Sequence, residues 1–341
     1  RILSSAASDV YKRQECSEEL TANQLFGENS NSLKELVELS TYGLVKLSGE
    51  VTTVDLNFPM YPGKCHLKGD EIKSAKEKAS NAGELENWRK YLTERNRDIW
   101  ELSKIKNTVL EKLENEGVEL ADYSKVMFML PRYCRGPAVA GSRYAWANCS
   151  RVELMAHEFS HNLGLGHSAS VGKGGDPLDS QGGVASTYNP VNRCIMGVLD
   201  REKILEIRES GVYQLKHLNH KASEGAVAAA IVREGVSRPV FLSWRNGGDA
   251  IDQALKWPYF YTLSAHAGLW DGRVKRSAHL GVAVPGKVKL FQGDGWAVEV
   301  SKITTVGKDT LSFAVRFKEG PYKDQIEAKS AGLETPSFFE Y

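Results

Sequence analysis

The chain lacks any apolar run long enough to cross a membrane, and it has almost no excess of charge of either sign. A bilayer-spanning helix needs about 20 consecutive, mostly apolar residues, so we expect no membrane insertion. The 44 basic and 43 acidic residues leave a formal net charge of +1. This balance gives no bulk attraction to nucleic acid or anionic lipid, and we therefore expect no nucleic-acid partner.

Cysteine is also scarce. An odd number of cysteines cannot pair completely within one chain. Cys134 and Cys149 form a candidate disulfide, but the spacing does not decide the connectivity, and composition leaves the cellular compartment open. The five cysteines are Cys16, Cys65, Cys134, Cys149 and Cys194.

What the chain does contain is a dense group of metal-binding residue types at positions 157–167, with the pattern H-E-x-x-H-x-x-G-x-x-H. Residues four apart share one face of a helix, so His157 and His161 can reach the same ion. Gly164 can adopt the left-handed conformation that ends a helix, which returns the chain so that His167 becomes a third ligand. Three protein ligands leave a fourth position for water, as in catalytic zinc sites. Glu158 is placed to handle the protons of that water.

The sequence around this string favours a helix independently of the metal. Ser150-Arg151-Val152-Glu153 has the pattern of a capping box, in which Ser150 and Glu153 bond the free backbone N–H groups. The following apolar residues recur at helical spacing and predict a buried face. They are Val152, Met155, Ala156, Phe159 and Leu163.

The eleven-residue string resembles the signature of the metzincin zinc peptidases, and more narrowly the gametolysin-like family associated with algal cell walls. Four further segments between about Ser30 and Ala265 resemble family motifs in the same order. They are Ser40–Leu47 (S-x-Y-G), Gly174–Asp179 (Y-G-D-P-S-D), Tyr188–Arg193 (F-N-A-P-x-R) and Phe241–Arg245 (Y-Y-L-x-Y-R).

The resemblance implies an α+β fold, with a metzincin-type catalytic domain of mixed twisted sheet and active-site helix over residues 15–205. It implies a secreted zinc endopeptidase with protein or peptide substrates, including cell-wall or matrix glycoproteins. Zinc is expected on His157, His161 and His167, with Glu158 as general base and acid. We therefore expect Glu158→Ala to keep zinc but lose hydrolysis, and His161→Ala to lose both.

Two alternatives remain open. One is a catalytically inactive relative that acts as an adhesion or recognition module, against which the intact Glu158 argues. The other is a different metal-dependent hydrolase that reuses the motif. Cleavage preference cannot be inferred, because the pocket walls come from loops with no readable code.

The family also has a methionine turn beneath the metal. Alignment through the Gly-Asp-Pro stretch places Gln181 at that methionine, whereas the nearby Met196 has the expected side chain. We favour Met196 and leave Gln181 as the alternative. Tyr188 is a candidate for the tyrosine that stabilises the oxyanion in some metzincins.

Other segments before residue 205 indicate the catalytic scaffold. We predict a helix over Leu33–Leu39, strands within Leu44–Phe58, helical structure over Glu71–Glu116 and a strand over Lys125–Leu130. The segment Arg143–Trp146 is expected to be the edge strand along which an extended substrate pairs.

Residues 206–320 read as an antiparallel β-sandwich, followed by a tail at 321–341. Short β-rich segments separated by Gly, Pro or Asp support this prediction. His217, His220, His266 and His279 lie here without ligand spacing, and are interpreted as ordinary histidines. The eight segments are Val212–Leu218, Ala226–Val232, Val240–Arg245, Phe260–Ala265, His279–Val284, Val288–Phe291, Ala297–Ile303 and Leu311–Phe317.

Residues 1–14 resemble a translated sequencing adaptor. They contain no starting methionine and no apolar periodicity, so we exclude them from the expected fold. We expect a signal peptide, any propeptide and a first strand of the catalytic domain to be missing from this sequence.

Overall fold

The computed structural model has mixed α+β structure, with several sheets and few helices. It describes residues 2–6, 17–28, 31–54, 98–130, 139–149, 152–170, 175–184, 186–220, 225–233, 239–253, 259–270, 275–293, 296–320 and 322. Contacts divide the chain into two compact units. Unit 1 contains residues 1–24 and 48–151, and unit 2 contains residues 25–47 and 152–341. We expected a boundary after residue 205, whereas these contacts group the candidate zinc helix with the C-terminal strands.

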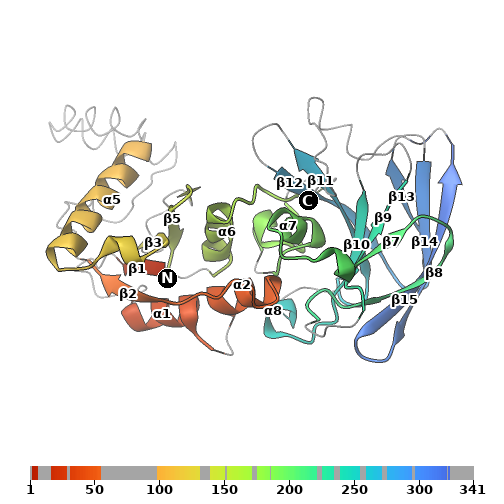
Figure 1. Cartoon of the computed structure of the whole chain (residues 1–341), viewed down its shortest axis with the longest axis horizontal. Coiled ribbons are helices and arrows are strands. Elements are labelled where there is room, and N and C mark those ends of the chain that lie inside the picture. Colours follow the sequence, from red (N-terminus) through yellow and green to blue (C-terminus); the bar gives the residue numbers. More distant parts are fainter. Residues whose placement is uncertain are drawn as a thin grey trace, which may run out of the picture. The chain divides into compact units, whose positions relative to one another are not determined.

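Unit 1 is built on a five-stranded sheet of order β2-β1-β3-β5-β4 (Figure 1). The first four strands in this order are parallel, and β4 is antiparallel to β5. Helix α5 (Asp98–Asn115) packs Val109 and Leu113 against Val126 and Phe128 of the sheet. The strands are β1 (Ile2–Ala6), β2 (Gly49–Thr53), β3 (Lys125–Leu130), β4 (Val139–Ala140) and β5 (Tyr144–Asn148).

Two features of this sheet differ from the sequence-based expectations. Residues 2–6 were excluded from the fold, yet they form β1 between β2 and β3. The segment Arg143–Trp146 was expected to form the edge of the sheet, but a further strand, β4, covers its last two residues. Val139 and Ala140 of β4 pair there with Trp146 and Ala145, so the backbone groups that face β4 at these positions are already in a sheet.

The predicted helices are found where the structure describes them. Leu33–Leu39 lies in α2 (Leu33–Ser40), whose N-terminus is capped by the Ser32 side chain accepting from Glu35 N–H. The predicted helical region ending at Glu116 contains α5, and its part before Asp98 lies outside the described residues. A further helix, α1 (Glu18–Phe26), was not predicted. Among the described residues, no helix has the length and apolar character of a membrane span.

Unit 2 contains a six-stranded sheet of order β6-β12-β11-β10-β9-β7 and a four-stranded sheet of order β13-β14-β15-β8. All eight predicted β segments overlap a strand. Two pairings, β6 with β12 and β7 with β9, are parallel rather than antiparallel. The strands are β6 (Ala169–Ser170), β7 (Ile204–Ile207), β8 (Gly211–Lys216), β9 (Ala228–Ile231), β10 (Val240–Trp244), β11 (Leu263–Trp270), β12 (Lys275–Ala283), β13 (Lys289–Gly293), β14 (Trp296–Val306) and β15 (Thr310–Glu319).

The two sheets of unit 2 share one hydrophobic core. Successive side chains of β10 point alternately into this core and to the opposite face of the six-stranded sheet. Leu242 and Trp244 face this core together with Phe291 and Phe313 of the other sheet. Phe241 points to the opposite face, where it packs with Val191 of α7 (Pro190–Ile195). The six-stranded sheet is therefore covered by the second sheet on one side and by α7 on the other.

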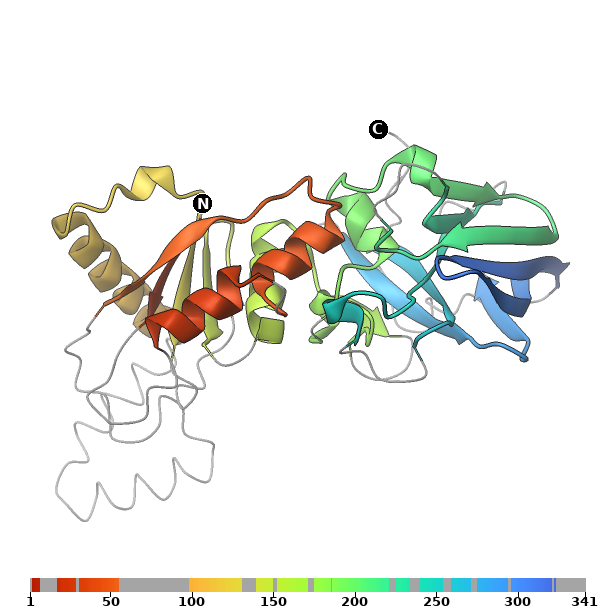
Figure 2. The same ribbon diagram turned by 90° about the horizontal axis from the view of Figure 1, so that it is seen from below.

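Helix α6 (Val152–Asn162), which carries the first two candidate ligands, also belongs to unit 2. It contacts the short 3-10 helix η2 (Ser180–Gly182) and also α2, the orange helix beside it in Figure 2. Unit 2 therefore supplies both the helix and the segment beneath it.

Candidate metal centre

Helix α6 forms and ends as the sequence predicts. Met155, Ala156 and Phe159 are buried at helical spacing, which fixes the helix by packing. Gly164 has φ +87°, and the N–H of Leu165 donates to the carbonyl of Ser160 at 3.1 Å. This left-handed turn ends the helix. The predicted cap, Ser150, lies outside the described residues.

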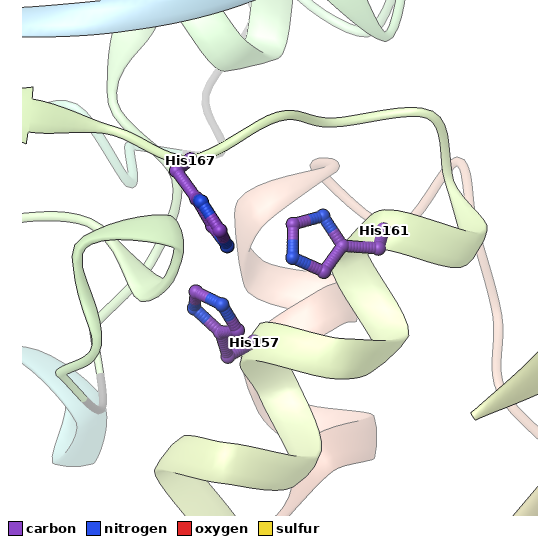
Figure 3. Close-up of side chains that lie close together, drawn as sticks. All are labelled: His157, His161 and His167. Atoms are coloured by element: carbon purple, nitrogen blue, oxygen red, sulfur yellow. The ribbon is translucent and has the colours of Figure 1, made fainter. Parts of the chain in front are cut away.

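The three histidines of the motif converge on one point. Figure 3 shows His157 and His161 on α6 and His167 on the segment that follows, with their rings turned toward one another. One ring nitrogen from each lies within 4.8 Å of the others. The ring centroids are 4.9 to 5.0 Å apart. The structure therefore brings together all three predicted ligands.

Backbone carbonyls orient two of these rings. His157 Nδ1 lies 3.1 Å from the carbonyl oxygen of Ser180, and His161 Nδ1 lies 2.7 Å from that of Leu165. A Nδ1–H that donates to a carbonyl leaves a lone pair on Nε2, which is the usual arrangement of a metal-ligating histidine. Burial also lowers the pKa of His157, His161 and His167, which favours the neutral form that binds metal.

The site is open on one side. His157 and His161 are half-buried, while His167 is exposed. A set of three imidazoles with one solvent-facing member suits a zinc ion that keeps an open position, rather than a closed structural site.

Glu158 is the acidic group of the site. It is buried, and its Oε1 lies 3.9 Å from His157 Nε2. Burial raises the pKa of Glu158 to about 7. A carboxyl group with a pKa near neutrality can both accept and return a proton at physiological pH.

The segment beneath His157 contains glutamine, not methionine. Gln181 is buried in η2, and its Nε2 donates to the backbone carbonyl of His157 at 2.7 Å. Met196 lies at the C-terminal cap of α7. Of the two candidates for the floor, Gln181 is the one for which the structure shows a hydrogen bond to the ligand helix.

Residues 175–184 and 186–189, here called the loop of residues 175–189, include η2 and are mostly buried, and polar contacts hold them. Gly175 and Gly182 approach so closely that a Cβ on either would overlap backbone atoms across the loop. Asp179 accepts from the N–H of Gln181 at 2.7 Å and from Asn192 Nδ2 at 3.0 Å. Burial, together with the neighbouring Asp176 carboxylate, raises the pKa of Asp179 to about 6.

Tyr188 does not fit the predicted oxyanion role. It is fully buried, and its hydroxyl is hydrogen bonded to the hydroxyl of Ser160 at 2.8 Å. Its N–H donates to Ser40 Oγ at 3.1 Å, and burial raises the pKa of its phenol. Tyr188 therefore connects α6 to the end of α2.

Tyr188→Phe is expected to distinguish a structural role of the Tyr188 hydroxyl from a role in stabilising the oxyanion. Removing one buried hydrogen bond costs about 1 kcal/mol of stability, so the urea midpoint should fall while kcat changes little. Loss of an oxyanion donor would instead lower kcat by about 10²- to 10³-fold. Steady-state kinetics and urea denaturation of the same preparation distinguish the outcomes.

Several residues near the site were missed by the sequence reasoning. Arg276 of β12 lies close enough to contribute to the lowered pKa values of His161 and His167. His266 and His279, interpreted as ordinary histidines, form a group with Asp176. A sequence signal existed only for the two histidines, because residues on neighbouring antiparallel strands can lie directly opposite one another, as His266 and His279 do.

For the candidate disulfide between Cys134 and Cys149, the structure describes only Cys149. Cys149 is disulfide-bonded, whereas Cys194 is free. Cys134 lies outside the described residues.

Comparisons with protein-family models, curated proteins and solved structures found no match to this chain.

Proposed function

We propose that this chain is a secreted zinc-dependent endopeptidase of the metzincin type, similar to the gametolysin-like family. The observation that carries the proposal is the convergence of His157, His161 and His167 beside the buried Glu158. The fold proposed with it is a metzincin-type catalytic domain followed by a β-sandwich. Proteins of the extracellular or cell-wall matrix are the proposed substrates, by analogy with that family.

Each residue of the site has a role in the proposed peptide hydrolysis. His157, His161 and His167 would hold the zinc ion, which when bound supplies a Lewis acid for the scissile carbonyl and lowers the pKa of water. Glu158 accepts a proton from the attacking water and returns it to the departing amine. The Ser180 and Leu165 carbonyls keep two imidazoles in the tautomer with a free Nε2.

The test measures zinc content and cleavage of a mixed peptide library, with and without a chelator. The expected result is cleavage that a chelator abolishes and zinc restores, and that His161→Gln removes together with the zinc. Zinc bound at the triad without peptide cleavage would favour the inactive adhesion or recognition module. Hydrolysis of esters or other amides in place of peptides would favour a different hydrolase.

The activity is expected to fall as the pH decreases through about 7. Because the pKa of Glu158 is raised to about 7, its carboxylate is present above that pH and lost below it. A bound cation opposes the effect of burial, which places the midpoint of the acid limb at or below about 7. Values of kcat/KM measured from about pH 4 to 9 test this expectation. A rate that stays constant down to about pH 4 would contradict the assigned base.

A further inference from the structure

A second group of ligand-type side chains lies in unit 2, away from the α6 motif. It consists of Asp176, His266 and His279, with one possible ligand atom from each within 4.8 Å of the others. All three are buried, with exposures of 0%, 1% and 6%. His266 and His279 are paired on adjacent strands β11 and β12, and Asp176 comes from the loop that also contains Gln181.

Two ring nitrogens of this group lack the hydrogen bonds that burial demands. Nδ1 of His266 and Nε2 of His279 make none. His266 Nε2 lies 3.1 Å from Asp176 Oδ2 and pairs with this carboxylate. Ligand atoms of a four-coordinate zinc ion lie about 3.3 Å apart, since Zn–N and Zn–O bonds are about 2.0–2.2 Å long. Buried polar atoms without partners point to an unassigned occupant.

The surroundings orient the group as a metal site would require. His279 makes a hydrogen bond with the backbone of Gly281. Its Nε2 is unpartnered, so this bond belongs to Nδ1 and leaves the Nε2 lone pair free. Asp176 Oδ1 accepts from the N–H of Leu178 at 2.9 Å, and Oδ2 accepts from Asn189 Nδ2 at 3.1 Å. Such outer contacts fix imidazole tautomers and carboxylate orientation in metalloproteins.

The buried carboxylates near this group also favour a bound cation. Asp176 and Asp179 are both fully buried and lie close enough to interact. Burying two carboxylates is costly unless cations compensate them. Imidazole and carboxylate together suit zinc among the divalent metals.

We propose that Asp176, His266 and His279 form a second, structural site for a divalent transition-metal ion of the zinc class. The ion would join β11 and β12 to the loop of residues 175–189. That loop carries Ser180 and Gln181, which contact His157. The proposal does not rest on peptidase activity.

The test uses the full chain with the α6 site removed by His161→Gln and His167→Gln, here called the triad variant. After dialysis against free zinc, wild type is expected to hold two zinc ions per chain and the triad variant one. His279→Gln in the triad variant should remove the remaining ion. Zinc, but not magnesium, should raise the Tm of the triad variant. A triad variant that folds and holds no zinc would overturn the proposal and show a metal-free buried ion pair.

A matched control excludes the third group of possible ligands, His217, His220 and Asp309. These residues are at least partly exposed, with 49% of the Asp309 side chain accessible, so His220→Gln should not disturb folding. The triad variant with His220→Gln is expected to keep its zinc, and loss of zinc there would overturn the proposal. This arm remains decisive if His279→Gln fails to fold, because it leaves the buried group intact.

Discussion

Glu158→Gln is expected to lower kcat/KM by about 10²- to 10⁴-fold while the chain keeps its zinc. Glutamine has nearly the shape of glutamate but cannot accept the proton of the attacking water. Because Glu158 is buried beside His157 rather than among the three converging imidazoles, its replacement leaves the ligand set intact. Kinetics with a cleaved peptide and zinc analysis of the same sample provide the two measurements.

Two controls sharpen this prediction. His161→Gln is expected to lose both zinc and activity, since it removes a ligand. Glu209→Gln makes the same change of charge at an exposed position and should leave kcat/KM unchanged. Normal peptidase activity in Glu158→Gln would reject the assigned mechanism, whatever its zinc content.

The parts of the site that could be predicted from the sequence are those determined by local geometry. His157 and His161 are separated by one helical turn, and Gly164 supplies the left-handed residue that returns the chain to His167. The strands of unit 2 could also be predicted from the sequence. Leu311, Phe313 and Val315 alternate with less buried residues along β15, as a half-buried strand requires.

Contacts between distant segments could not be predicted in the same way. Asp176 meets His266 across 90 positions of sequence, and only the packing of a loop on a sheet brings them together. Gln181 shows a different limit. The motif alignment pointed to Gln181, but the expected side chain led us to prefer Met196. The hydrogen bond from Gln181 to His157 O shows that a polar side chain supports the ligand helix at this position.

Among the substitutions considered for their effect on stability, Arg245→Met is expected to lower the free energy of unfolding most, by about 3–5 kcal/mol. Arg245 Nη1 lies 2.7 Å from Asp252 Oδ1, and the two side chains are 3% and 0% exposed. Burial raises the pKa of Asp252 even though Arg245 is adjacent, so desolvation of this carboxylate is not fully offset. Removing the guanidinium leaves a buried charge without its partner.

A double variant tests whether this unpaired charge is the cause. Arg245→Met with Asp252→Leu is expected to recover part of the stability, because the buried carboxylate that Arg245→Met leaves unpaired is then removed as well. Arg208→Met breaks a more exposed pair with Glu206, at 2.6 Å, and should cost no more than about 1 kcal/mol. Urea denaturation of the four proteins gives these differences. Equal losses for Arg245→Met and Arg208→Met would show that burial does not determine the effect.

Arg245→Met is also expected to weaken zinc binding at the α6 site. Arg245 Nη2 donates to the carbonyls of Leu178 at 2.9 Å and Thr187 at 2.8 Å, on either side of Ser180. Ser180 in turn accepts from His157, so loss of Arg245 loosens the support of a ligand without removing it. Loss of such outer support typically costs about 10- to 100-fold in metal affinity. Zinc titration of folded Arg245→Met at low urea, beside Arg208→Met, measures this coupling. An unchanged affinity would show that the loop of residues 175–189 holds its position without the guanidinium.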